Sequence, residues 1–253
     1  MRKILVFRLQ GKMAHFRRYY TNSTALSYWV PPRTTVVGII AGLMGWSRNS
    51  YYEVFSLGRC RIALQTVFPL KKQIQKLNLL MVKSSNDLNG SQKYHSQTPT
   101  ELVIPQNIRD EILDYRVWLS HNDGNIMKQL ENLLEDRRPV YQSRGISLGL
   151  GVASHLGWTV FDGTVDGEEI NDTEIVPISS IVPINLIQDI DVAAGERAYR
   201  LVREELPLEF DSKRRITERG KGDMVINLSG RPIWARVSAA LRLGDGNYIT
   251  WME

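Results

Sequence analysis

The order in which strand-like and helix-like segments follow one another constrains this fold more than any other sequence feature. Residues 3–9 alternate around an apolar centre and predict a strand; after the Pro31-Pro32 pair, a helix is predicted from a cap at Thr34 or Thr35 to Trp46. A second strand is predicted at residues 59–68. After an insertion, strand character resumes at residues 102–104 and 113–119, which we count together as the third strand. A second helix is predicted at residues 125–134 and a last strand at residues 152–161. This β-α-β-β-α-β order is typical of an α+β, ferredoxin-like (RRM-like) fold, whose sheet leaves one face open for RNA.

Two further regions accompany this unit. Residues 71–100 carry five lysines, a single acid and a long polar run, which predicts a protruding basic hairpin. From about residue 175 the sequence changes to short strand-like pieces at 174–182, 224–228, 233–237 and 248–251. We therefore expect a ferredoxin-like unit with an insertion at residues 1–165, and a smaller β-rich region at residues 166–253.

The charges are distributed very unevenly. The chain has a net charge of +5, but residues 1–100 alone carry +13 and residues 101–253 carry −8; the first acid is Glu53. A positive field of this size at one end attracts a polyanion, and nucleic acid is the usual one. The alternative is a basic surface that only maintains solubility.

Several classes of site and protein are disfavoured. Cys60 is the only cysteine, and the four histidines are scattered without metal-ligand spacing, so we expect no disulfide, metal site or cofactor. The longest apolar stretch, residues 34–46, is shorter than the roughly 20 residues that a membrane span needs. Without a signal peptide at the N-terminus, the expectation is a cytoplasmic protein that contacts no membrane.

Residues 11–46 carry a specific pattern. A Gly-x-x-Ala-x-Phe-Arg loop follows the first strand, and Ser-Tyr-x-x-Pro-Pro-Arg-Thr-Thr then precedes an apolar helix that ends in glycine. This pattern resembles the fifth Cas family of CRISPR-associated proteins, RAMP-type subunits of the type I surveillance complex (Cascade). The Tyr51-Tyr52 pair is similar to the type I-B or I-A branch. Weaker similarity continues at residues 139–149 and 205–215.

The resemblance implies a non-catalytic, RNA-gripping subunit of an antiviral ribonucleoprotein complex. In the family, a ferredoxin-like palm with a projecting thumb holds the 5′ handle of the CRISPR RNA (crRNA) and contacts the Cascade large and backbone subunits, with target DNA contacted indirectly. The thumb would be residues 71–100.

The expected RNA contacts combine cations that pair with phosphate and an aromatic ring that stacks on a base. The candidates are Lys12, Arg17, Arg18, Tyr19, Arg33, Lys71, Lys72, Arg144, Arg214 and Arg215. Tyr28 and Trp29 are expected to pack in the core.

Two other functions are compatible with the sequence. Lys93, Tyr94 and His95 adjoin, and such residue types can cleave RNA by activating a 2′-hydroxyl, so a metal-independent endoribonuclease that processes pre-crRNA is the alternative. However, Tyr94 separates the lysine from the histidine, unlike the Lys-His pair of the type I-C branch. A general RNA-recognition module is the third possibility, but the usual signature of that module is missing.

Overall fold

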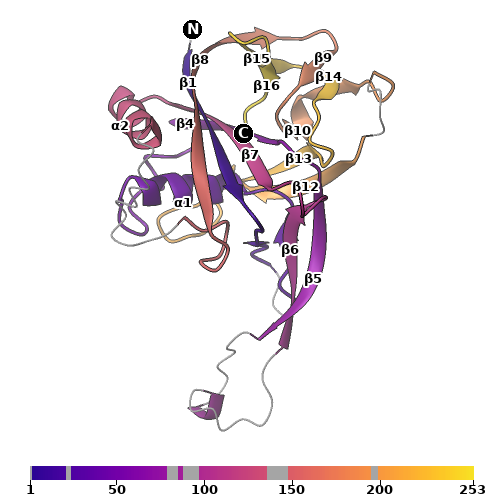
Figure 1. Cartoon of the computed structure of the whole chain (residues 1–253). Coiled ribbons are helices and arrows are strands. Elements are labelled where there is room, and N and C mark those ends of the chain that lie inside the picture. The colour runs from indigo at the N-terminus through magenta and orange to yellow at the C-terminus, as the bar shows by residue number, and fades with distance from the viewer. Residues whose placement is uncertain (1, 21–23, 79–84, 88–96, 136–147, 195–198) are drawn as a thin grey trace.

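The computed structural model describes residues 2–20, 24–78, 85–87, 97–135, 148–194 and 199–253. Two helices and four strands between Arg2 and Asn171 form one unit, which we call the first part of the fold (Figure 1). They are β1 (Arg2–Gly11), α1 (Arg33–Leu43), β4 (Cys60–Thr66), β7 (Leu113–His121), α2 (Gly124–Glu135) and β8 (Gly157–Asn171). The strands lie in the order β8-β1-β7-β4, and every neighbouring pair is antiparallel. The predicted succession of strands and helices is thus present.

A hairpin projects from this body (Figure 1). Its strands, β5 (Leu70–Asn78) and β6 (Gln97–Pro105), pair along their whole length, from Leu70 opposite Pro105 to Asn78 opposite Gln97. The short 3-10 helix η1 (Ser85–Asp87) lies between them in the sequence. The protruding hairpin predicted at residues 71–100 is therefore observed, and β6 also contains the strand expected at 102–104.

The remaining elements are short. β2 (Phe16–Arg17) pairs with β3 (Ser27–Tyr28) in the segment between β1 and α1. The C-terminal part contains β9 (Val176–Ile178), β10 (Val182–Pro183), η2 (Ile184–Leu186), β11 (Ile187–Ile190), β12 (Leu201–Pro207), β13 (Lys221–Asn227), β14 (Ile233–Val237), β15 (Ala239–Leu243) and β16 (Tyr248–Ile249).

The C-terminal strands continue the sheet of the first part. β15 pairs with the second half of β8, so one nine-stranded sheet runs β11-β14-β9-β16-β15-β8-β1-β7-β4. The sheet curls: the N–H groups of Ile181 and Met252 donate to Leu64 and Ile62 on the outer edge of β4, at 2.7 and 2.8 Å. The boundary expected between residues 165 and 166 falls inside β8, and residues from both sides of it share a hydrophobic core.

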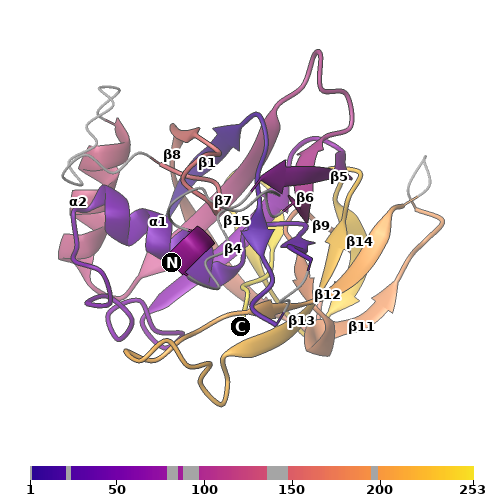
Figure 2. The same cartoon turned by 90° about the horizontal axis from the view of Figure 1, so that it is seen from below.

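Both faces of β1 are buried from Ile4 to Phe7, which explains its continuous apolar run. Leu5, Phe7 and Leu9 face α1 and α2 in the main core. Ile4 and Val6 face the other way and pack in a second cluster with Leu241, Ile249 and Trp251. In Figure 1 the helices accordingly lie on one side of these strands, and β15 and β16 lie on the other; Figure 2 shows α1 and α2 on one side from below.

This second cluster corrects the expectation of an open sheet face. Trp118, Ala63 and Ile4 lie on the face opposite the helices, yet each is at most 1% exposed because β15, β16 and the residues after them cover it. The end of this face that bears Arg8, Arg116 and Trp158 remains partly exposed. A base-binding surface spread over the whole sheet face is therefore excluded.

Two predicted boundaries shift for local reasons. Helix α1 begins at Arg33, after Pro32, and no side chain caps it. The hydroxyl of Thr34 points instead to the carbonyl of Pro207, at 3.5 Å. Strand β8 begins at Gly157 rather than at residue 152, because residues 149–156 form a turn in which the Leu150 N–H donates to the carbonyl of His155. No helix among the described residues has the length and apolar character needed to span a membrane.

Candidate nucleic-acid interface

The segment that follows β1 is held between the hairpin and the turn before β8. Ala14 and Val103 exchange two backbone hydrogen bonds of 2.9 Å, and Nδ1 of His15 donates to the carbonyl of Glu101 at 2.7 Å. On the other side, Gly151 has a φ of +92°, and a Cβ there would lie 2.0 Å from the His15 carbonyl oxygen. This close approach explains why the position is glycine. Residues 11–16 are therefore fixed by contacts with two distant parts of the chain.

Arg18 lies at the junction between this segment and β12. Its guanidinium pairs with the carboxylate of Glu204 and donates to the Tyr20 hydroxyl at 2.7 Å. The other oxygen of Glu204 accepts the backbone N–H of Trp29 at 2.9 Å. Burial raises the pKa of Glu204, while the Trp29 N–H and Arg18 oppose that shift. The expected RNA contact Arg18 is thus engaged in an internal ion pair with a buried acid.

Lys72 on β5 is also engaged internally. Its ammonium donates to the carbonyl of Ser27, lies 3.1 Å from the carboxylate of Glu101, and stands 4.6 Å from the centroid of the Trp29 ring. Its side chain is only 14% exposed. Lys72 therefore joins the root of the hairpin to the segment before α1, a role that needs no RNA.

The prediction that Arg33 contacts RNA is wrong. Arg33 is 2% exposed, and its guanidinium donates to the carbonyls of Leu208, Phe55 and Cys60 at 2.9, 2.8 and 2.5 Å. Burial lowers its pKa. Sequence pattern could not distinguish it from a surface arginine, because the three carbonyls come from segments remote from Arg33. Tyr28 and Trp29 do pack, as expected, with Tyr28 1% exposed.

The structure places the other candidate RNA contacts in different surroundings. Arg214 donates to the Tyr52 hydroxyl at 3.2 Å, and Arg215 pairs with Asp211 at 2.8 Å while remaining 71% exposed. The side chain of Lys71 is half-buried on β5. The remaining candidates, Arg144 and the Lys93, Tyr94 and His95 group, lie outside the described residues.

The exposed candidates gather around the same segment. Tyr19 and Tyr20 are 47% and 53% exposed, and their rings meet edge to face at 5.2 Å. The ammonium of Lys221 on β13 lies 5.5 Å from the centroid of the Tyr19 ring. Together with the exposed Lys12 and Arg17, these residues form what we call the loop surface: Lys12, Arg17, Tyr19, Tyr20 and Lys221. Exposed cations beside exposed aromatic rings can pair with phosphates and stack on bases.

Sequence reasoning missed Glu204, on which the position of Arg18 depends. Along β12, Val202, Glu204 and Leu206 share one face, while Arg203 and Glu205 point outward and are exposed. A single acid on the apolar face of an alternating strand was the available signal, because such a charge needs a partner.

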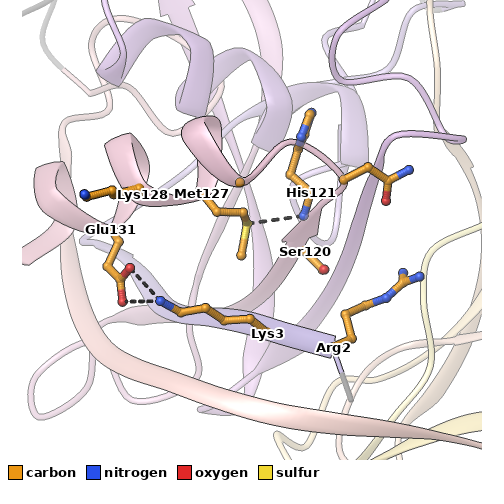
Figure 3. A pocket seen from close by; sticks show the side chains of 9 residues that line it. Arg2, Lys3, Ser120, His121, Met127, Lys128 and Glu131 are labelled. Carbon is orange, nitrogen blue, oxygen red and sulfur yellow. Dashed lines mark hydrogen bonds and ion pairs between the residues drawn. The ribbon is translucent and has the colours of Figure 1, made fainter.

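A pocket of 460 Å³ opens beside α2 (Figure 3). The Lys3 ammonium contacts both carboxylate oxygens of Glu131, at 2.9 and 2.7 Å. His121 uses both ring nitrogens: Nε2 donates to the Val54 carbonyl and Nδ1 accepts the Asp123 N–H, each at 2.9 Å. Among the described residues no group of three or more His, Cys, Asp or Glu is arranged to hold a metal ion.

Known proteins resemble this chain in part of the sequence and in the fold. Residues 4–103 match the family described as CRISPR-associated protein (Cas_Cas5). A CRISPR protein from Archaeoglobus fulgidus has a similar fold, with a TM-score of 0.59 and 13% identity over 98% of both chains. A chain described as CRISPR RNA-guided surveillance complex gives a TM-score of 0.45 at 12% identity, covering 92% of this chain and 91% of that one. No curated protein matches the sequence. The predicted resemblance to the Cas5 family of CRISPR-associated proteins is confirmed over residues 4–103.

Proposed function

We propose that this protein is a non-catalytic RNA-binding subunit of a type I CRISPR surveillance complex (Cascade), acting in the cytoplasm in antiviral defence. It holds the 5′ handle of the crRNA, contacts the large and backbone subunits, and meets target DNA only indirectly. The loop surface is the observation that carries this proposal, because it presents Lys12, Arg17 and two exposed tyrosines within residues 4–103, the region that matches the family, with Lys221 beside them.

The strand arrangement supports the finer fold assignment. In a ferredoxin-like unit, the fourth strand lies beside the first, the third lies on the other side of the first, and the second is outermost. Strands β8, β1, β7 and β4 follow this order, with α1 and α2 as the two connections. We therefore interpret these elements as the palm and the β5–β6 hairpin as the thumb.

The electrostatics support RNA as the ligand. Of the five residues of the loop surface, three are cationic and none is acidic, and the ammonium of Lys221 lies 3.4 Å from the carboxylate of Glu205. Phosphate contacts of this kind dominate nucleic-acid affinity and weaken with salt. The tyrosine rings add stacking that tolerates any base.

The test is fluorescence anisotropy of a labelled, repeat-derived RNA titrated with the full chain at several salt concentrations. We expect Lys12→Ala with Arg17→Ala to weaken binding about tenfold or more and to reduce the salt dependence, since cations that contact phosphate release counterions. Lys128→Ala, an exposed lysine on α2, is the matched control and should bind like the wild type. Equal affinities for the wild type and the double variant would contradict the interface.

The absence of catalysis is part of the proposal. The histidines in the described part of the chain, His15, His121 and His155, are each at most 8% exposed, so none of them can readily reach a 2′-hydroxyl. We expect labelled repeat RNA to remain intact with excess protein. Cleavage at a defined site that is lost in His95→Ala would instead favour the endoribonuclease.

A further inference from the structure

The uncovered end of the sheet carries an ordered network of polar side chains. Gln10 Nε2 donates to Asp114 Oδ2 at 2.6 Å, and the Arg8 guanidinium lies 3.2 Å from the same oxygen. Arg8 also contacts Asp162 at 3.1 Å, and Arg116 lies 3.4 Å from Asp162. These groups come from β1, β7 and β8, so the network joins three neighbouring strands. Its cations and acids balance, which leaves little net charge at this position.

Trp158 is the outer member of this network. Its indole Nε1 donates to Gln10 Oε1 at 2.9 Å, and Gln10 is directly opposite it in the register of β1 and β8. Gln10 is 7% exposed and is itself held by Asp114, which is 1% exposed. Trp158 nevertheless remains 40% exposed. The ring is thus fixed through its N–H while a large part of its surface stays in water.

The surroundings of Trp158 connect it to the loop surface. Gly11 pairs with Gly157 across the two strands, so Lys12 and Met13 leave β1 beside the start of β8. Leu156 precedes that pair and is 60% exposed, and Met13 is 36% exposed. Because the indole N–H already donates to Gln10, a ligand can contact this side chain only through the face or edge of its ring. Nucleobases stack on such rings without any need for base-specific hydrogen bonds.

We propose that Trp158 is a stacking platform for an unpaired base of the RNA whose phosphates contact the loop surface, and that Gln10 is the positioning residue for its ring. This inference rests on the proposed RNA-binding function and adds a second, uncharged point of contact. RNA is favoured over a protein partner for two reasons: the platform is continuous with Lys12, and partly exposed charged groups, Arg8, Arg116 and Asp162, border it in addition to the apolar Met13 and Leu156.

The test uses the labelled repeat-derived single-stranded RNA and the full chain. We expect Trp158→Phe to bind within about twofold of the wild type, because it keeps an aromatic face. Trp158→Ala and Trp158→Leu should both bind about fivefold or more weakly, with an unchanged salt dependence, because no phosphate contact is lost. Leu156→Ala is the matched control for an exposed apolar side chain and should leave affinity unchanged. Gln10→Met removes the oxygen that accepts the indole hydrogen bond. It should therefore weaken RNA binding in the wild-type background but not in a Trp158→Ala background.

Intrinsic fluorescence supplies a second measurement that does not depend on the alanine variant folding. Unlabelled RNA should quench the wild type more than Trp158→Phe, since a stacked base contacts the indole directly. Equal quenching, or wild-type affinity in Trp158→Ala, would overturn the platform while leaving the proposed function intact. Wild-type affinity in Trp158→Leu would mean that the site is a general apolar contact, as for a protein partner. No RNA binding by the wild type would overturn both proposals.

Discussion

The guanidinium of Arg18 is paired with the carboxylate of Glu204, which lies 186 residues further along the chain. Glu204 is 6% exposed and also accepts the N–H of Trp29, so one acid on β12 orients two parts of the segment between β1 and α1. This pair explains why an arginine beside the loop surface is not a simple phosphate contact. It also makes the position of the loop depend on the C-terminal part of the chain.

The first prediction concerns this pair. Arg18→Ala leaves Glu204 buried without its cation and should lower the free energy of unfolding by about 2 kcal/mol. Glu204→Gln keeps an acceptor for Trp29, so the double variant Arg18→Ala/Glu204→Gln should lose less than the sum of the single variants. Urea unfolding measures all three. Strict additivity would mean that the two side chains do not interact in solution.

The second prediction concerns Arg33, whose guanidinium satisfies three carbonyls. A lysine ammonium at this position cannot reach all three with the same fork geometry, so Arg33→Lys should lower the free energy of unfolding by about 3 kcal/mol. Urea unfolding is the measurement, with Arg17→Lys, an exposed arginine on β2, as the matched control that should retain wild-type stability. A fully stable Arg33→Lys protein with weaker RNA binding would restore Arg33 to the interface.

The third prediction is a pH dependence. Burial lowers the pKa of His155 below its ordinary value of 6.5, and nearby His15 adds to that shift. Because the unfolded chain then binds more protons than the folded chain below pH 6.5, the free energy of unfolding falls as the pH decreases through this range. His155→Gln removes this titration, so its stability should decline less between pH 7 and about pH 5. Parallel pH profiles for both proteins would show that His155 contributes nothing.

The fourth prediction separates the root of the hairpin from its outer part. Replacing residues 77–98 with a short Gly/Ser turn keeps Lys72 with its partners Ser27 and Glu101, so the protein should unfold cooperatively at nearly the wild-type urea midpoint. Replacing residues 72–98 removes Lys72 and should lower the midpoint. Both variants should bind repeat RNA more weakly if the hairpin is the thumb. Wild-type RNA affinity in both would make it a passive insertion.

The order of the elements of the first part followed from the sequence because it depends on local patterns. Alternation predicted β1 and β7, and apolar positions spaced at three and four residues predicted α2, where Ile126, Met127, Leu130 and Leu134 are buried. The prolines and the apolar run placed α1 to within a few residues. The motif at residues 11–46 indicated the resemblance to the Cas5 family for the same reason, since its spacing is a property of consecutive residues.

Only the tertiary structure decided which of the cations are exposed. Arg17, Arg18 and Arg33 look alike in the sequence, yet one is exposed, one pairs with Glu204, and one is buried against three carbonyls. The covered sheet face likewise depends on the pairing of β15 with β8. Burial of a side chain is set by partners from remote segments, and the cost of desolvating a charge is offset only when those partners arrive in three dimensions. Local periodicity therefore determined the elements, and contacts between remote segments determined the surface.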